Sequence, residues 1–196
     1  TGQPGRLDVP GDGEQSTFVQ NVVLNLAVVK GNTTFRPPDY EFRVVPVFNL
    51  NHTRVEEERA LRVDPRRGVA RTDRFVGMQE LFADKHLRNV SERYDFDSLR
   101  VGIQPLNLDF RGFLFQDAAL AVRLFGIRDN NLWQYNLGWA RRLEKDSNSG
   151  LNDLSQDARN DELFFFNLYR QDFPRVGFTS QLVVVRNDNR EAAPAY

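Results

Sequence analysis

The stretch Leu132–Lys145 (LWQYNLGWARRLEK) constrains the fold more than any other part of the chain, because its side chains alternate strictly in character. Its odd positions hold large apolar residues, namely Trp133, Tyr135, Leu137 and Trp139. Its even positions are small, polar or charged, namely Gln134, Asn136, Gly138, Ala140, Arg142 and Glu144. A period of two residues predicts a β-strand with one apolar face and one polar face.

The same alternation recurs along the chain and predicts an all-β, antiparallel fold. The predicted strands are residues 18–30, 40–51, 74–87, 99–105, 120–126, 132–145, 163–169 and 178–186. Residues 74–87 fit a helical stripe about as well, and we assign them to a strand because their neighbours are strands. Pro46 cannot donate to a sheet ladder, so it predicts a bulge or an edge. Residues 1–17 are predicted to be a loop or linker and residues 188–196 an unstructured tail, with the β segment between them at 18–187.

The connections between these strands alternate in length. Those after the first, third, fifth and seventh strands are shorter (31–39, 88–98, 127–131 and 170–177), and those after the second, fourth and sixth are longer (52–73, 106–119 and 146–160). Up-and-down membrane barrels have short turns at one end and long loops at the other. A soluble meander has no such requirement, so the pattern favours a transmembrane β-barrel.

Composition excludes several classes of function. The net charge of −1 provides no excess of cations for phosphates, so we expect no nucleic-acid partner. The absence of cysteine removes disulfides, thiolate metal sites and cysteine nucleophiles. The two histidines, His52 and His86, have no serine at a recognisable offset, so we expect no enzyme activity and no cofactor. Oxygen-bearing residues between Asp146 and Asp153 resemble a calcium loop only loosely, because the closing glutamate is missing, and we expect a polar turn and no metal.

Two architectures share this alternation. In a membrane barrel the apolar face meets lipid, which makes Phe42, Phe48, Trp133, Tyr135 and Trp139 the lipid-facing candidates. In a soluble β-sandwich the same face meets a protein core.

Three short segments resemble consecutive strands of Gram-negative outer-membrane porin-type barrels, including the phosphate-selective and alginate-export groups. The segments are Gln79-Glu80-Leu81-Phe82, Leu99-Arg100-Val101-Gly102-Ile103-Gln104-Pro105 and Ala121-Val122-Arg123-Leu124-Phe125-Gly126. The resemblance covers about residues 75–145. Ile103 stands where a basic residue is usual and Ala121 where glycine is usual, so the family's basic specificity residues are not carried over. The resemblance implies an outer-membrane location and an antiparallel up-and-down barrel.

We therefore expect a segment of a transmembrane β-barrel in the bacterial outer membrane that passes small polar or anionic solutes by diffusion. Polar side chains opposite the apolar face would line its pore, namely Arg43, Arg100, Gln104, Arg123, Gln134, Asn136, Arg142 and Glu144. The alternative to a pore-lining role is that a carboxylate on a neighbouring strand neutralises the charge of each arginine, which then only stabilises the wall. Eight strands alone would enclose an interior filled with side chains, so further strands and a larger barrel are expected, with outer-membrane lipid and a second copy of the chain as partners. The alternative function is a soluble, secreted carbohydrate-binding β-sandwich module.

Overall fold

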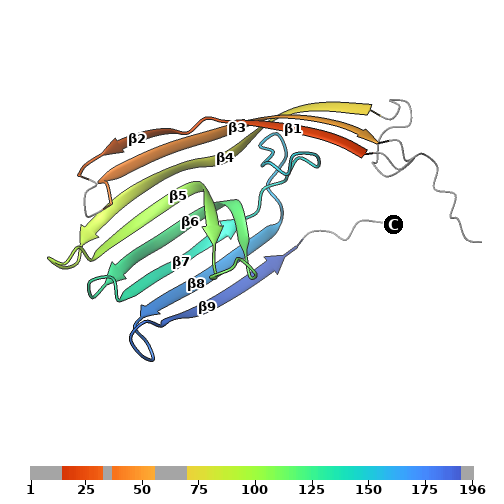
Figure 1. Ribbon diagram of the computed structural model, residues 1–196. Coiled ribbons are helices and arrows are strands. Elements are labelled where there is room, and N and C mark those ends of the chain that lie inside the picture. The colour runs from red at the N-terminus through yellow and green to blue at the C-terminus, as the bar shows by residue number, and fades with distance from the viewer. Residues whose placement is uncertain (1–14, 33–36, 56–69, 191–196) are drawn as a thin grey trace, which may run out of the picture.

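The computed structural model describes residues 15–32, 37–55 and 70–190, and these form one antiparallel sheet of nine strands (Figure 1). The strands are β1 (Gln15–Val23), β2 (Leu26–Lys30), β3 (Tyr40–Val55), β4 (Ala70–Asn89), β5 (Phe96–Asn107), β6 (Gln116–Arg128), β7 (Trp133–Arg141), β8 (Asp161–Gln171) and β9 (Thr179–Asn189). From β3 to β9 each strand pairs with the next one in the sequence, so the predicted all-β up-and-down topology is confirmed. No helix in the described part is long and apolar enough to cross a membrane.

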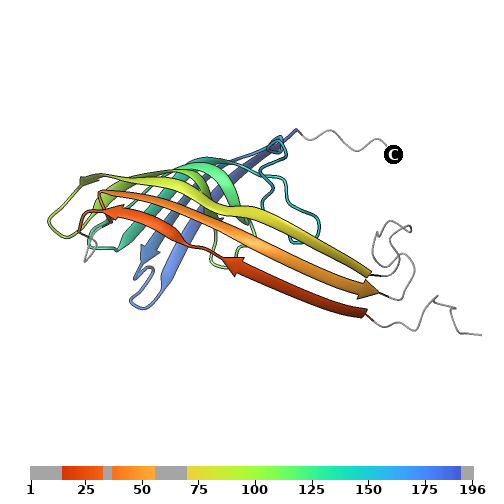
Figure 2. The ribbon, with the colours of Figure 1, turned by 90° about the horizontal axis from the view of Figure 1, so that it is seen from above.

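The sheet is not closed into a barrel. One edge is formed by β1 and β2, which both pair with β3, and the other edge is formed by β9. The sheet is curved, and β1, β3 and β4 together run on beyond the ends of β5 to β9 (Figure 2). The expected closure of the barrel is therefore not present within the described residues.

Pro46 causes the main departure from the predicted strands. The register of β3 against β4 shifts between Val45 and Pro46, which confirms the predicted bulge. The predicted strand 18–30 is divided into β1 and β2 opposite this bulge, and the amide of Leu24 donates to the carbonyl of Pro46 at 3.1 Å. Residues 74–87 are a strand, as predicted, within the longer β4.

The two ends of the sheet differ in the length of their connections. Residues 90–95, 129–132 and 172–178 form the short-turn end, and residues 108–115 and 142–160 form the long-loop end. The turn 129–132 is tight because Asp129, Asn130 and Asn131 all take positive φ angles (55°, 55° and 67°), which Asn and Asp tolerate better than other residues. Most of the predicted connection 52–73, namely residues 56–69, lies outside the described residues.

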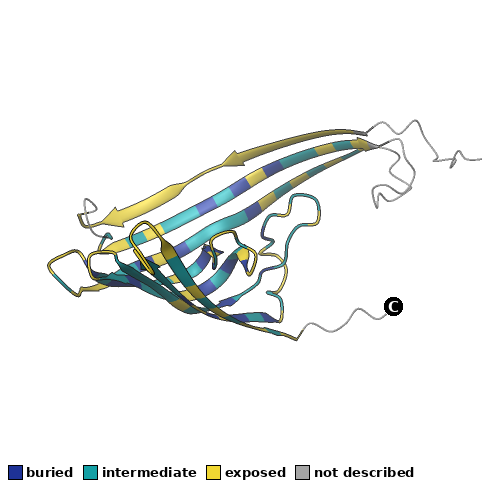
Figure 3. Ribbon diagram, turned by 60° about the horizontal axis from the view of Figure 1, so that its bottom comes forward, coloured by how far each residue is buried: buried dark blue, intermediate teal, exposed yellow. Residues whose placement is uncertain are grey.

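The strand register divides the side chains into two faces. We call the face on which the 108–115 and 142–160 loops lie the inner face, and the opposite one the outer face. Buried and exposed residues alternate along the central strands (Figure 3). The register places buried residues such as Phe82, Ala121 and Phe165 on the inner face and exposed apolar residues such as Phe42, Val101 and Phe164 on the outer face. One row of directly paired outer-face residues runs across β3 to β8 as Phe42, Ala83, Val101, Val122, Trp139 and Phe164. The β-sandwich interpretation requires a second sheet over this face, and the described part of the chain has none.

The hydrophobic core lies between the inner face and the chain that joins β5 to β6. Residues 106–115, which we call the β5–β6 tip, fold back over the sheet (Figure 1). The tip contributes Leu106, Leu108 and Phe115, and the sheet contributes Ala119, Ala121, Ala140, Leu163 and Phe165. The three alanines are fully buried, because their small side chains leave the tip room to approach the sheet.

Polar contacts hold the β5–β6 tip in place. The carbonyl of Leu108 accepts hydrogen bonds from Asn167 Nδ2 (2.8 Å) and Gln181 Nε2 (3.0 Å). Within the tip, the carboxylate of Asp109 accepts the amide hydrogens of Leu114 (2.7 Å), Arg111 and Phe113. The hydrogen bond from Leu114, more than the other amides, lowers the pKa of Asp109 below its usual range, because these amides favour the charged carboxylate.

Phe164 and Phe165 are adjacent in β8 and lie on opposite faces of the sheet, so substituting each of them tests which face holds the core. Phe165 is 5% exposed in the core, and Phe164 is 47% exposed on the outer face. Phe165→Ala should lower the free energy of unfolding by about 3–5 kcal/mol, because it loses apolar burial and leaves a cavity. Phe164→Ala should cost about 1–2 kcal/mol, because it leaves no cavity. Urea unfolding under identical conditions measures both, and an equal or reversed order would contradict this assignment of the core.

Candidate functional site: an arginine and phenylalanine ladder on the inner face

Three arginines and two phenylalanines alternate across β3, β4, β5 and β6 on the inner face. Arg43 lies over the ring of Phe82 with its guanidinium carbon 5.9 Å from the ring centroid, and Arg100 lies over the same ring at 4.2 Å. Arg100 also lies 5.6 Å from the ring of Phe125, which contacts Arg123 at 4.5 Å. We call these five residues the arginine ladder. Stacking on aromatic rings keeps the guanidinium planes fixed and leaves their edges free for hydrogen bonds.

Only part of the positive charge in this ladder is neutralised by the described residues. Glu41 pairs with Arg43 at 2.6 Å, and Asp84 pairs with Arg100 at 2.8 Å from a site where the carboxylate side chain is 4% exposed. Arg123 faces Arg100 directly across the β5–β6 register. No carboxylate of the described chain lies within ion-pair distance of Arg123, and its buried Nε has no hydrogen-bond acceptor. Two guanidiniums therefore share one carboxylate.

The register places six of the eight expected pore-lining residues on the inner face: Arg43, Arg100, Gln104, Arg123, Gln134 and Asn136. Gln104 is fully buried there and donates to the carbonyl of Ala121 at 3.2 Å, so it holds the β5–β6 hairpin rather than facing open space. The five lipid-facing candidates, Phe42, Phe48, Trp133, Tyr135 and Trp139, lie together on the outer face.

Arg142 and Glu144 depart from the expected alternation because β7 ends at Arg141, and they lie in the 142–160 loop. Arg142 pairs with Asp161 at 3.3 Å and lies over the ring of Phe115 at 5.0 Å, against the β5–β6 tip. Glu144 lies 3.8 Å from Arg159 within its own loop. Arg142 N still donates to the carbonyl of Asp161 in the register of the β7–β8 ladder, whereas the carbonyl of Arg142 accepts from Arg159 N, which lies out of that register and begins the folded loop.

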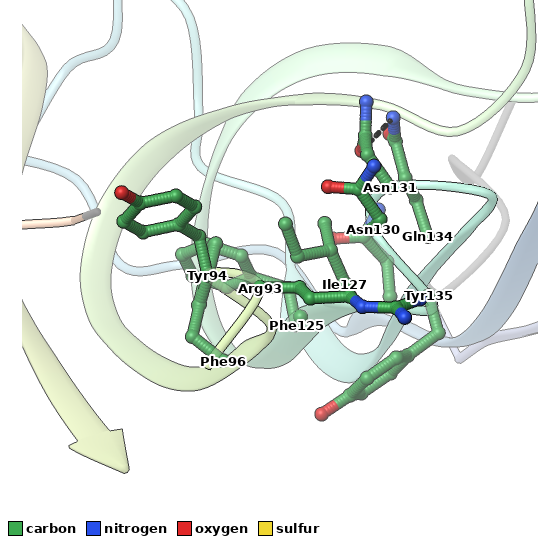
Figure 4. A pocket seen from close by; sticks show the side chains of 11 residues that line it. Arg93, Tyr94, Phe96, Phe125, Ile127, Asn130, Asn131, Gln134 and Tyr135 are labelled. Carbon is green, nitrogen blue, oxygen red and sulfur yellow. Dashed lines mark hydrogen bonds between the residues drawn. The ribbon is translucent and has the colours of Figure 1, made fainter. Parts of the chain in front are cut away.

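A cavity of about 520 Å³ opens beside the ladder, at the short-turn end of the sheet (Figure 4). Phe125 belongs to both the ladder and the cavity wall, and Phe96, Ile127, Gln134 and Asn136 line it from neighbouring strands. Arg93 and Tyr94 reach it from the turn between β4 and β5. Its mixed wall of amides, rings and one arginine suits a small polar molecule better than an apolar one.

Two aspartates that the sequence analysis did not single out organise the short-turn end. Asp97 is buried and accepts hydrogen bonds from Arg88 Nε (2.8 Å), Arg128 (2.6 Å) and the hydroxyl of Tyr135. Asp95 accepts the amides of Asp129 and Asn130, both at 3.0 Å, which joins the β4–β5 turn to the β6–β7 turn. In the sequence, the Asp-Phe-Asp pattern at 95–97 is the signal that points to these two residues. Carboxylates that become buried need hydrogen-bond donors from elsewhere in the chain.

Side-chain oxygens of the 142–160 loop accept hydrogen bonds from the loop itself. Asp146 Oδ2 accepts from the amides of Asn148 and Ser149 and from the Ser149 hydroxyl. Asn152 is fully buried and donates to the carbonyls of Met78 (3.0 Å) and Ala118 (3.2 Å). In the described residues no group of three or more histidines and carboxylates is arranged to hold a metal ion. Asn152 thus anchors the loop to β4 and β6.

The two histidines lie apart on the sheet. Nδ1 of His52 lies 2.7 Å from the Thr72 hydroxyl on the outer face. His86 Nε2 contacts Asn89 at 2.9 Å, and its ring lies 5.9 Å from that of Phe96.

Comparison of the chain with protein-family models, with curated proteins and with solved structures finds no match.

The charge balance of the ladder can be tested through Asp84. Asp84→Asn should lower the free energy of unfolding by about 3 kcal/mol, because it leaves two facing guanidiniums without their buried counter-charge. The double variant Asp84→Asn/Arg100→Gln should recover more than half of that loss. Glu41→Gln is the matched control and should cost under about 1 kcal/mol, because the Glu41–Arg43 pair is more exposed. A double variant no more stable than Asp84→Asn alone would show that the ladder does not need this charge balance.

Proposed function

We propose that this chain forms part of the wall of a closed outer-membrane β-barrel, and that the arginine ladder lines a passage for small polar or anionic solutes. The observation that carries the proposal is the outer face, which presents exposed apolar side chains on every strand from β3 to β9, with Arg170 and Arg186 as charged members on β8 and β9. Exposed side chains on it include Phe42, Val101, Leu137, Phe166 and Val184. A monomer in water rarely leaves so large a continuous apolar surface uncovered, whereas a barrel wall requires it.

The height of this apolar band supports a membrane. On β3 the outer face is apolar from Tyr40 to Phe48, and on β7 from Trp133 to the last apolar position before Arg141. The stretch on β3 is about 26 Å long and the stretch on β7, from Trp133 to Trp139, is about 20 Å long, at roughly 3.3 Å per residue. With a strand tilt of about 40° these lengths correspond to about 20 Å and about 15 Å of depth, against an apolar band of roughly 25 Å in known barrels. Beyond it, towards the long-loop end, the outer face carries Arg141, Glu162 and Asp188.

The open edges support completion by further strands. Lipid cannot satisfy unpaired backbone groups, so a membrane-spanning sheet has to close. In this proposal additional strands, from the same protein or from a second copy of the chain, pair with β1 and β2 on one side and with β9 on the other. The short-turn end then faces the periplasm and the long-loop end the exterior.

The inner face supports passage of small polar or anionic solutes. Arg123 has no carboxylate partner in the described chain, and a fixed guanidinium lowers the electrostatic barrier for anions. The β5–β6 tip covers the part of the inner face over β7 to β9. In this proposal the passage therefore runs along β3 to β6, where the arginine ladder lies. The ladder would then select solutes by charge, and the tip by size.

Membrane fractionation of the full-length protein tests the location. We expect recovery with the outer membrane, extraction only by detergent, and a shift in gel mobility on boiling, because closed barrels resist unfolding in detergent. Recovery in the soluble fraction with no mobility shift would overturn the barrel proposal and would leave the sugar-binding alternative to be tested by tryptophan fluorescence.

Arg123→Gln tests the role of the ladder in a planar bilayer. The ratio of anion to cation permeability, measured from reversal potentials in a salt gradient, should fall about threefold, since a unit charge some ångströms from a permeating ion in water contributes roughly 0.6 kcal/mol. Arg186→Gln removes the same charge from the outer face and should leave the ratio unchanged. Equal ratios for all three proteins would show that the ladder does not face the ion path.

A further inference from the structure

A second cavity, of about 320 Å³, lies on the outer face at the short-turn end, away from the arginine ladder. Its wall is formed by the residues Trp133, Leu168, Arg170, Phe173, Ser180, Gln181 and Leu182. The register explains their proximity, because Trp133 pairs with Arg170 and Arg170 with Ser180, while Leu168 pairs with Leu182. Apolar side chains dominate the wall, and one guanidinium stands at its rim.

The charge of Arg170 is not neutralised within the described chain. Its guanidinium carbon lies 4.3 Å from the centroid of the Trp133 ring, and no described carboxylate lies within ion-pair distance. Two arginines of neighbouring strands at this end, Arg88 and Arg128, both pair with Asp97. Arg170 therefore offers a planar set of donors that is positioned by an aromatic ring and open to an anion from outside.

The apolar wall continues away from this rim. Leu168 and Leu182 lie next to the outer-face row of Leu137, Phe166 and Val184, which is exposed throughout. At the opposite side the Ser180 hydroxyl donates to the carbonyl of Phe173 at 2.7 Å, which ties the β8–β9 turn to the start of β9 beside the cavity. The site thus combines one cation, Arg170 at the short-turn end, with apolar side chains that continue along the outer face.

We propose that this cavity binds an anionic phospholipid, with the phosphate on Arg170 and the first methylene groups of an acyl chain on Leu168, Leu182 and Phe173. Charge complementarity selects the headgroup, and the apolar wall excludes a free phosphate as the natural occupant. The inference rests on the proposed function, because it requires that the outer face meets lipid.

Quenching of tryptophan fluorescence by brominated lipids tests both proposals separately. The chain has two tryptophans, so Trp139→Phe leaves Trp133 as its single reporter. The protein is reconstituted into phosphatidylcholine vesicles that contain a small fraction of brominated phosphatidylglycerol or, in parallel, the same fraction of brominated phosphatidylcholine. Phosphatidylglycerol should be enriched about fivefold beside Trp133, the size expected for one cation near an anionic headgroup.

Arg170→Gln in this background should bring the enrichment close to one, and Arg170→Lys should retain most of it because the charge remains. Arg186→Gln is the matched control on the outer face and should keep the full enrichment. Equal quenching by both lipids in the Trp139→Phe protein with Arg170 intact would overturn the anionic site. It would leave the proposed lipid-facing wall standing. No quenching by either lipid would overturn the proposed membrane wall as well.

Discussion

A single antiparallel sheet has two faces, and the described chain covers only one of them. Backbone pairing fixes which side chains share a face, so the apolar positions of every strand from β3 to β9 gather on one surface whatever lies against it. The inner face is packed by the chain's own loops. The outer face keeps a large set of exposed apolar side chains, each of which costs free energy when it stays in contact with water. This imbalance between the faces is the observation on which the proposed barrel wall rests.

The inner face is itself divided between packing and charge. On β6 to β8, Ala121, Ala140 and Phe165 receive the β5–β6 tip, and on β3 to β6 the arginine ladder replaces apolar contacts. Gly102 lies at the boundary with a φ of +127°, and a Cβ atom there would come within 2.2 Å of the carbonyl oxygen of Leu81. A side chain at this position would push β4 and β5 apart, and the ladder needs both strands.

Alternation in the sequence predicts the strands and their faces because it is a local property of each strand. The lipid-facing candidates share the outer face for this reason, and the bulge at Pro46 follows from the missing amide hydrogen. The segment that packs against a face of the sheet is not determined by local sequence. The Phe-rich segment 106–119 gave no periodicity, so its fold over the three alanines depends on contacts with β8 and β9 that lie far along the chain. The pairing of Asp84 with Arg100 likewise depends on the register of β4 against β5, which single-strand patterns do not determine. The open form of the sheet likewise is not determined by the pattern of any single strand.

Arginines outnumber lysines in this chain by 23 to three, and guanidiniums suit a sheet that holds charge beside aromatic rings. Arg43, Arg100, Arg123, Arg128, Arg142 and Arg170 each lie over an aromatic ring, and on the inner face these rings are phenylalanines that offer no hydrogen bond. A guanidinium can stack its flat face on a ring while its edge donates to a carboxylate, as Arg100 does between Phe82 and Asp84. An ammonium group binds its water more strongly and has no flat face to stack. The same geometry leaves Arg123 and Arg170 without a carboxylate partner in the described chain, on opposite faces of one sheet. In the proposed function the first would meet solutes and the second would meet lipid phosphates.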